Sequence, residues 1–119
     1  MKLLTYDTET GPRCGVLQND DVVDVSALVG DGRRLPDVRA LLELGDSPID
    51  RVRDALAKNL TAPKVALADV RLRSPILQPP TVRDFIVYEE HASNQGTREP
   101  NEVWYRMPVF YFSNPLCIY

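Results

Sequence analysis

The stretch Arg13-Cys-Gly-Val-Leu-Gln-Asn-Asp-Asp-Val-Val-Asp-Val25 determines how the first part of the chain folds. Apolar residues cluster at Arg13–Leu17 and again at Val22–Val25, with a polar break between the two clusters. Short apolar segments separated by Asn and Asp are typical of antiparallel strands joined by turns. A similar segment, Lys2–Tyr6, precedes them, so the chain is predicted to begin as a β-meander.

Two helices are predicted to follow, at residues 36–44 and 48–60. Proline is favoured in the first turn of a helix, and glycine is favoured just beyond its end. Pro36 and Gly45 occupy these two places around the first helix. The sequence therefore indicates a short helix that is followed by a left-handed glycine.

The second of these helices carries a capping pattern and an apolar stripe. Ser47 precedes a proline, and Asp50 stands three residues after Ser47, as in a capping box. Four apolar residues recur at helical spacing and form one face: Ile49, Val52, Leu56 and Leu60. We expect this face to pack on the sheet, with a further strand at Val65–Leu72.

A stiff connector is predicted at residues 74–81. Each proline fixes its own φ and excludes the helical region for the residue before it. The connector contains three prolines, which are Pro75, Pro79 and Pro80. Such a segment is extended, and we place a domain boundary there.

The composition of the chain differs on the two sides of this connector. Eight of the nine aromatic residues fall at or after Phe85, and Tyr6 is the exception. Before the connector we predict an α+β domain at residues 1–73, built from a small antiparallel sheet and two helices. After it, residues 82–119 are predicted to begin a second domain.

The second segment starts with helical signals. A helix is predicted over Thr81–Gln95, because its first residue is a capping threonine and Gly96 is suited to end it. Beyond Glu102 the pattern is β-rich. On such a helix, Asp84 and His91 lie on one face, about 10.5 Å apart along the axis.

Charge and hydropathy argue against two classes of partner. The chain carries 17 acidic and 14 basic residues, a net charge of −3, so no basic surface for nucleic acid or anionic membranes is expected. Its longest aromatic and apolar runs, Phe85–Tyr88 and Val109–Phe112, have four residues, whereas a bilayer span needs about 20. Cys14 and Cys117 form no C-x-x-C pair, and we interpret them as free thiols of a cytoplasmic protein.

His91 is the only histidine of the chain, and it directly follows Glu89 and Glu90. A lone histidine is usually structural or simply exposed, and that is one interpretation. The other is that the carboxylates orient the imidazole and make it more basic, as a general base near neutral pH requires. Asp84 also has two interpretations, as a helix-capping residue or as an oxygen ligand for a cation. The two glutamates are equally typical of a solvated face.

Three segments closely resemble the fumarylacetoacetate hydrolase family: Arg83-Asp-Phe-Ile-Val-Tyr-Glu-Glu-His91, Asn94-x-Gly96 and Trp104-Tyr-Arg-Met-Pro-Val-Phe-Tyr-Phe-Ser-Asn-Pro115. They occur in the family's order and at approximately its spacing. The opening Met1–Tyr6 also looks like the family's N-terminal domain, in a more generic way. The resemblance covers the whole chain and is specific after Val82.

The resemblance implies a fold and a chemistry. In that family a small N-terminal domain precedes a mixed β-roll catalytic domain. The catalytic domain holds Mg²⁺, with Ca²⁺ or Mn²⁺ as alternatives, and acts on small oxo acids. Members hydrolyse C–C bonds in acylpyruvates and β-diketo acids, as in aromatic catabolism, and the metal stabilises the developing enolate charge.

The same resemblance implies site residues, position by position. Asp84 matches a metal-ligand position. His91 matches the catalytic base, which works with a carboxylate that we assign to Glu90. Tyr111 lies near a substrate-contact position, and Arg98 aligns more loosely with a group that meets the substrate carboxylate.

Two other functions stay open beside the hydrolase. One is an isomerase, decarboxylase or hydratase of the same family, and the other is a binding or assembly module without turnover. The family's remaining metal ligands, a Glu-x-Glu pair and an Asp, belong to a later part of its catalytic domain. We therefore expect residues 1–119 alone to be inactive, and to form a homodimer or to associate with the missing remainder of that domain.

Overall fold

The chain divides into two compact units. The structure, a computed structural model, describes residues 1–29 and 31–116. The first unit holds Met1–Leu77 and the second begins at Gln78, so the division falls within residues 74–81. Antiparallel strands and short helices make the fold α+β. None of the helices in the described part of the chain has the length and apolar character that crossing a bilayer requires.

The first unit is built on a five-stranded antiparallel sheet with the strand order β4-β3-β2-β1-β5. The predicted meander forms its centre, with β1 (Lys2–Tyr6), β2 (Arg13–Gln18) and β3 (Asp21–Asp24). Lys2 lies opposite Leu17 in the β1–β2 pair, and the polar residues after Leu17 form the turn into β3. The meander prediction is therefore confirmed in this unit.

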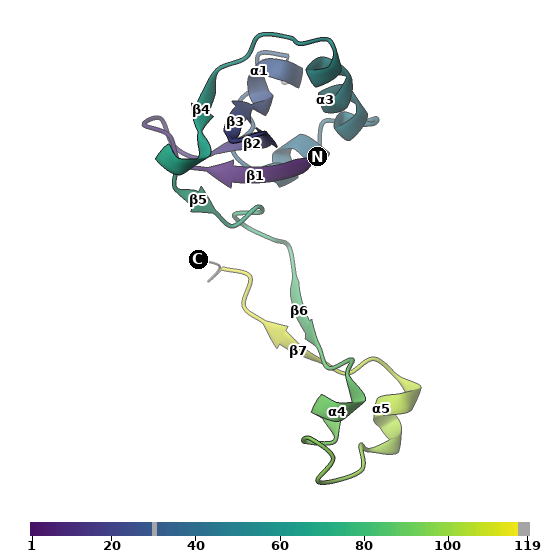
Figure 1. The fold of residues 1–119 in the computed structure, drawn as a ribbon. Helices are drawn as coiled ribbons and strands as arrows, with labels where there is room; N and C mark the ends of the chain where they lie inside the picture. The colour runs from purple at the N-terminus through teal and green to yellow at the C-terminus, as the bar shows by residue number, and fades with distance from the viewer. Residues whose placement is uncertain (30, 117–119) are drawn as a thin grey trace. The chain divides into compact units, whose positions relative to one another are not determined.

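Neighbouring segments of the chain form the two edges of this sheet. β4 (Lys64–Ala66) pairs with β3, and β5 (Leu72–Arg73) pairs with β1 at the opposite edge. The predicted single strand Val65–Leu72 is therefore wrong, because the 3-10 turn η1 (Leu67–Asp69) interrupts it. The edges of a flat five-stranded sheet lie about 19 Å apart. The link from Ala66 to Leu72, which contains the 3-10 turn, spans only about 16 Å. The sheet must therefore curl until its edges approach each other (Figure 1).

Helices cover one face of the curled sheet (Figure 1): α1 (Val25–Val29), α2 (Val38–Leu42) and α3 (Pro48–Ala57). Their apolar side chains and those of the facing strands form the core, which consists of Cys14, Val16, Val23, Val25, Val29, Leu35, Leu41, Val52 and Ala55. The sequence predicts only two of these helices. α1 is additional, because the Asp24 carboxylate accepts the N–H groups of Ser26 and Ala27 and so starts a helix at Val25, where the predicted strand was expected to end.

The ends of α2 differ in part from the prediction. Asp37 caps the helix, and its Oδ1 accepts the N–H of Ala40 at 2.9 Å. Pro36 therefore precedes the cap and does not form the first turn. Gly45 has a φ of 94°, so the predicted left-handed glycine after the helix is confirmed. The thiol of Cys14 is buried and free, whereas Cys117 lies outside the described residues.

α3 begins at Pro48 as predicted, but without the predicted cap. Ser47 has a φ of 49°, and its side chain makes no capping hydrogen bond. Its carbonyl accepts the N–H of Asp50 instead. Of the predicted stripe, Val52 is fully buried, while Leu60 lies beyond the helix and is exposed. The remaining members are half-buried and pack against the core, and they are Ile49 and Leu56.

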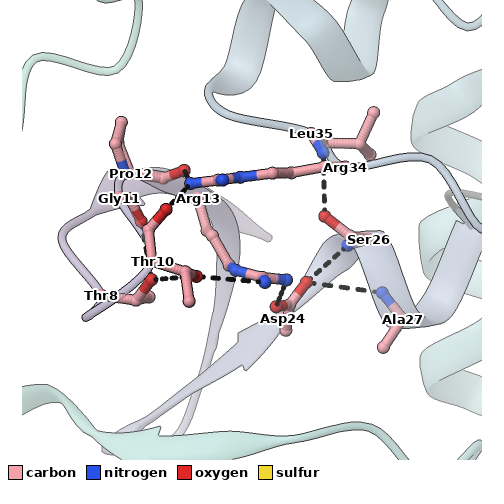
Figure 2. Close-up of polar contacts among 10 residues, drawn as sticks. All are labelled: Thr8, Thr10, Gly11, Pro12, Arg13, Asp24, Ser26, Ala27, Arg34 and Leu35. Carbon is pink, nitrogen blue, oxygen red and sulfur yellow. Dashed lines mark hydrogen bonds and ion pairs between the residues drawn. The ribbon is translucent and has the colours of Figure 1, made fainter.

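The inner face of the curled sheet, which the helices do not cover, is packed around Gly15. A Cβ atom at Gly15 would lie 2.6 Å from Val22 Cγ1 and 3.0 Å from Tyr6 Cε1. Only a residue without a side chain therefore allows the Tyr6 ring to lie against this strand. Tyr6 is directly opposite Arg13, and Figure 2 shows the Arg13 guanidinium between Thr10 and the Asp24 carboxylate.

The second unit is an antiparallel hairpin with two short helices in its connection. β6 (Val82–Phe85) pairs with β7 (Phe110–Ser113). α4 (Glu89–Ala92) and α5 (Glu102–Arg106) lie at one end of the hairpin (Figure 1). Among the described residues of this unit, Ser93 alone is buried. The apolar core described above thus belongs to the first unit.

Two predictions for this unit are wrong. Residues 81–95 do not form one helix, because β6 occupies their first part and only Glu89–Ala92 is helical. Residues 103–106, which were expected to be β-rich, belong to α5, and the Asn101 side chain caps this helix by accepting the N–H of Val103. The aromatic β7 strand supplies the pairing partner for β6, and this long-range pairing outweighs the local capping signals.

Candidate functional site

The register of β6 and β7 places Asp84 directly opposite Tyr111. Residues that lie opposite each other in an antiparallel pair project from the same face of the sheet. Both side chains are exposed to solvent. The hairpin therefore brings together the predicted metal ligand and the predicted substrate contact, which are far apart in the sequence.

The other face of the hairpin carries Arg83 against aromatic rings. The guanidinium carbon of Arg83 lies 3.7 Å from the ring centroid of Phe112 and 5.3 Å from that of Phe110. The rings of Phe85 and Phe110 are 5.1 Å apart. Each cation–π contact at an exposed site contributes about 0.5–1 kcal/mol. These contacts favour the register that sets Asp84 across from its partner on the opposite face.

α4 places His91 and Glu90 at one hollow of about 410 Å³. Both residues are exposed, and Tyr88, Glu89 and Gln95 complete its lining. An imidazole beside carboxylates in a solvent-filled hollow has the groups needed to take a proton from water.

Asp84 is placed differently from the expectation based on a single helix. It lies on β6, whereas His91 lies on α4, and Asp84 does not line the hollow of His91. The predicted arrangement of the two residues on one helical face is therefore wrong, because strand pairing takes residues 82–85 out of the helix.

Two hydrogen bonds hold the short helices in place. The Tyr105 hydroxyl on α5 donates to Glu89 Oε1 on α4 at 2.8 Å. This bond to a carboxylate raises the pKa of the Tyr105 phenol. The indole Nε1 of Trp104 donates to the carbonyl of Ile86 at 2.8 Å. α5 is thereby linked to Glu89, which precedes Glu90 on α4, and to Ile86, which follows β6.

Arg98 lies in the loop after α4. Its backbone N–H donates to the carbonyl of Ser93 at 3.1 Å. The Ser93 hydroxyl donates to the carbonyl of Glu90 at 3.0 Å, which ties the loop back to α4. The Arg98 side chain is exposed and does not line the hollow of His91. The structure thus places Arg98 near α4 in the chain without bringing its guanidinium to the hollow.

The described residues do not fit a metal site. Residues 1–29 and 31–116 contain no group of three or more His, Cys, Asp or Glu side chains arranged to hold an ion. Asp84 supplies one carboxylate, whereas a hard cation such as Mg²⁺ takes about six oxygen ligands. Asp84 by itself therefore does not make a Mg²⁺ site in this part of the chain.

The first unit contains a polar cluster that the sequence patterns did not predict. Asp24 is only 5% exposed, and it accepts Arg13 Nη1 at 3.0 Å and the N–H of Ser26 at 2.7 Å (Figure 2). Tyr6 is also 5% exposed, and burial together with the Asp24 carboxylate raises the pKa of its phenol. Two signals point to the cluster in hindsight. One is a carboxylate enclosed by apolar residues in Val22–Val25, and the other is a single aromatic residue in the first domain.

Comparisons with known proteins do not assign the chain to a family. No protein-family model matches the sequence, and no curated protein matches it. The resemblance to the fumarylacetoacetate hydrolase family therefore rests on the segments between Arg83 and Pro115, and it remains a prediction.

Proposed function

We propose that the chain is part of a metal-dependent hydrolase that cleaves C–C bonds in acylpyruvates or related β-diketo acids. The observation that carries this proposal is the β6–β7 register, because it pairs the two most specific motif segments and sets Asp84 opposite Tyr111. In this proposal Met1–Leu77 is the N-terminal domain, and the second unit begins a mixed β-roll catalytic domain. The proposed setting is the cytoplasm.

His91 is the proposed general base, assisted by Glu90 at the same hollow. Its imidazole accepts a proton from water, and the resulting hydroxide adds to the acyl carbonyl of the substrate. The C–C bond then breaks, which releases a carboxylic acid and the enolate of pyruvate. The enolate takes up a proton and becomes pyruvate, so the reaction consumes one water molecule in total.

Two further side chains have proposed roles in binding. The exposed phenol of Tyr111 is suited to hydrogen bond a substrate oxygen, and the guanidinium of Arg98 is suited to pair with the substrate carboxylate. Mg²⁺, with Ca²⁺ or Mn²⁺ as alternatives, stays the cofactor that we propose from the resemblance. Because Asp84 alone does not fit a metal site, no step is assigned to the metal.

An assay on the protein as its gene encodes it tests this proposal. Acylpyruvate consumption and pyruvate formation are followed together, with Mg²⁺, with Mn²⁺ and with EDTA. We expect one pyruvate for each acylpyruvate consumed, and loss of turnover in EDTA. Conversion of oxo acids without release of pyruvate would instead show an isomerase, decarboxylase or hydratase.

A second candidate function is assembly without turnover, and exposed aromatic side chains of the second unit favour it. Tyr88 is 75% exposed, Phe112 is 72% exposed and Tyr111 is 65% exposed. Tyr111 and Phe112 project from opposite faces of the hairpin, so each face of β7 exposes an aromatic ring, and aromatic residues are enriched at protein interfaces. Light scattering after size-exclusion chromatography tests it: a homodimer that Phe112→Ser converts to monomer, in a protein without turnover, would favour assembly. A wild-type monomer would argue against it.

A further inference from the structure

The inner face of the curled sheet opens into a hollow of about 800 Å³ within the first unit. Its walls come from the ends of β1 and β3, the start of β2, the loop after Tyr6, and the chain on both sides of η1. Hollows of about 300–1,000 Å³ are the usual size of sites for small molecules. We call this hollow the sheet mouth. It is separate from every residue used in the proposed hydrolase reaction.

Tyr6 supplies a polar group that the fold itself does not use. Its side chain is 5% exposed and its hydroxyl forms no hydrogen bond with the described residues. No fully buried side-chain nitrogen or oxygen in the described chain lacks a partner. The Tyr6 hydroxyl is therefore not sealed in the core, and it reaches the space of the sheet mouth that Tyr6 lines. It is available there to donate and to accept one hydrogen bond.

Each cation that lines the sheet mouth already lies near a carboxylate. Arg13 pairs with Asp24 at 3.0 Å, and Lys64 pairs with Asp21 at 2.8 Å. Arg71 lies 4.0 Å from the carboxylate of Asp7, which also pairs with Arg73 at 3.4 Å. Figure 2 shows how closely the Arg13 guanidinium is held, since Thr10 also accepts from it. An anionic ligand at Arg13 would therefore have to displace the Asp24 carboxylate.

Two carboxylates of the sheet mouth are left without a cation. Glu9 and Asp69 line it, and neither forms an ion pair with the described residues. Both are exposed, so the attraction for a mobile cation is modest and is screened by salt. The excess charge of the mouth is negative, which selects a cationic ligand over an anionic one.

The remaining walls are apolar and suit a short hydrocarbon stem. Pro63, Val65 and Val70 line the mouth together with Tyr6. Burying each CH₂ group of a stem against such a wall contributes about 0.8 kcal/mol. A ligand with both a positive charge and a short stem therefore suits the two unpaired carboxylates and the apolar wall of this space.

We propose that the sheet mouth binds a small organic cation, an ammonium group on a short aliphatic stem. Its N–H group donates to the Tyr6 hydroxyl, and its charge lies between Glu9 and Asp69. The stem packs against the apolar wall. This site is independent of the proposed hydrolase reaction, so either proposal stands or fails without the other.

A titration with matched probes tests the charge requirement. n-Butylammonium, 1-butanol and butyrate share one stem and differ in charge, and each is added to the whole ¹⁵N-labelled chain at constant ionic strength. We expect n-butylammonium to produce saturable amide shifts at Tyr6, Val65 and Val70. 1-Butanol should bind more weakly, and butyrate should produce no saturable shift. Equal or tighter binding of butyrate, or no saturable shift with n-butylammonium, would overturn the proposal.

Variants identify the groups that bind. Tyr6→Phe keeps the ring and removes the hydroxyl, so affinity for n-butylammonium should fall about tenfold, as for a hydrogen bond to a charged group. The double variant Glu9→Gln/Asp69→Asn should lose about fivefold. The charge-matched control is Asp46→Asn/Asp54→Asn, which removes two exposed carboxylates outside the sheet mouth and should bind like the wild type. If Tyr6→Phe does not fold, the double variant alone tests the site. Unchanged affinity of the double variant for n-butylammonium would refute the assignment of this ligand to the sheet mouth.

Discussion

Leu77 and Asp37, which lie 40 residues apart in the sequence, are joined by a hydrogen bond of 3.0 Å from the Leu77 N–H to Asp37 Oδ2. The same carboxylate caps α2 through Oδ1. Beside it, the carbonyl of Pro75 accepts the Val38 N–H at 3.0 Å and the Thr5 hydroxyl at 2.8 Å. These bonds anchor the beginning of the proline-rich connector to the first unit.

Asp37→Ala should lower the free energy of unfolding of the first unit by about 2–3 kcal/mol, because it removes a helix cap and a buried acceptor at once. Asp37→Asn keeps an amide oxygen that accepts the Ala40 N–H, but its NH₂ group replaces the oxygen that accepts the Leu77 N–H. It should therefore lower the free energy of unfolding less than Asp37→Ala does. Urea unfolding followed by circular dichroism measures both. Equal stability of Asp37→Ala and the wild type would contradict this role.

Gly15→Ala should destabilise the first unit by about 1–3 kcal/mol, the usual cost of overpacking. The added Cβ would lie 2.6 Å from Val22 Cγ1 and 3.0 Å from both Leu4 Cδ1 and Tyr6 Cε1. Val22→Ala removes the nearest of these atoms, so the cost of the double variant should be smaller than the sum of the two single costs. The same urea experiment tests it, and strictly additive costs would show that the inner face has room at Gly15.

The Cys14 thiol gives the first unit a pH-dependent stability. Burial, then the carboxylates of Asp37 and Asp24, raise its pKa from 9.0 to about 12. Between the unfolded and the folded pKa the folded chain keeps the thiol proton, whereas the unfolded chain loses it. The contribution of the thiol to the free energy of unfolding is therefore complete below about pH 9, and it is lost as the pH rises toward the folded pKa. Unfolding free energies measured in reducing buffer between about pH 8 and pH 11 should fall more steeply for the wild type than for Cys14→Ala. Parallel slopes would contradict the buried-thiol account.

Local patterns predicted most of the first unit because its strands pair with sequence neighbours. β1, β2 and β3 are joined by short polar turns, and the left-handed Gly45 has a direct signal in the sequence. The break between β4 and β5 was not predictable in this way. It follows from the pairing of both segments with opposite edges of one sheet, which no local window contains.

The second unit and the candidate site were less predictable for the same reason. The capping signals near Thr81 were genuine residue preferences, but Val82–Phe85 gains a strand partner some 25 residues later and becomes β6. The identities of Asp84, His91 and Tyr111 came from motifs, whereas the pairing of Asp84 with Tyr111 came only from the register. The Tyr6–Asp24 cluster was missed because its members are isolated in the sequence and meet through strand pairing and the curl.

Glu89→Gln should lower the pKa of the Tyr105 phenol toward its usual value of 10.0. The Glu89 carboxylate accepts a hydrogen bond from the Tyr105 hydroxyl at an O···O distance of 2.8 Å and so favours the neutral phenol, whereas the amide of glutamine carries no charge. Titration of Tyr105 ring signals by NMR measures the shift. Glu102→Gln on α5 is the control and should leave the titration unchanged. An unaltered Tyr105 titration in Glu89→Gln would show that α4 and α5 are not linked through this bond.

The central claim is that His91 is the base of a C–C hydrolase, and the turnover of His91→Gln tests it most directly. In the protein as its gene encodes it, acylpyruvate cleavage is measured for the wild type, His91→Gln and the control Glu102→Gln, each checked for a native circular dichroism spectrum. We predict that His91→Gln lowers kcat at least about 100-fold, the effect expected for loss of a positioned base, while Glu102→Gln stays near the wild-type value. A kcat for His91→Gln within a few-fold of the wild-type value would contradict the assignment and return His91 to an exposed residue of α4.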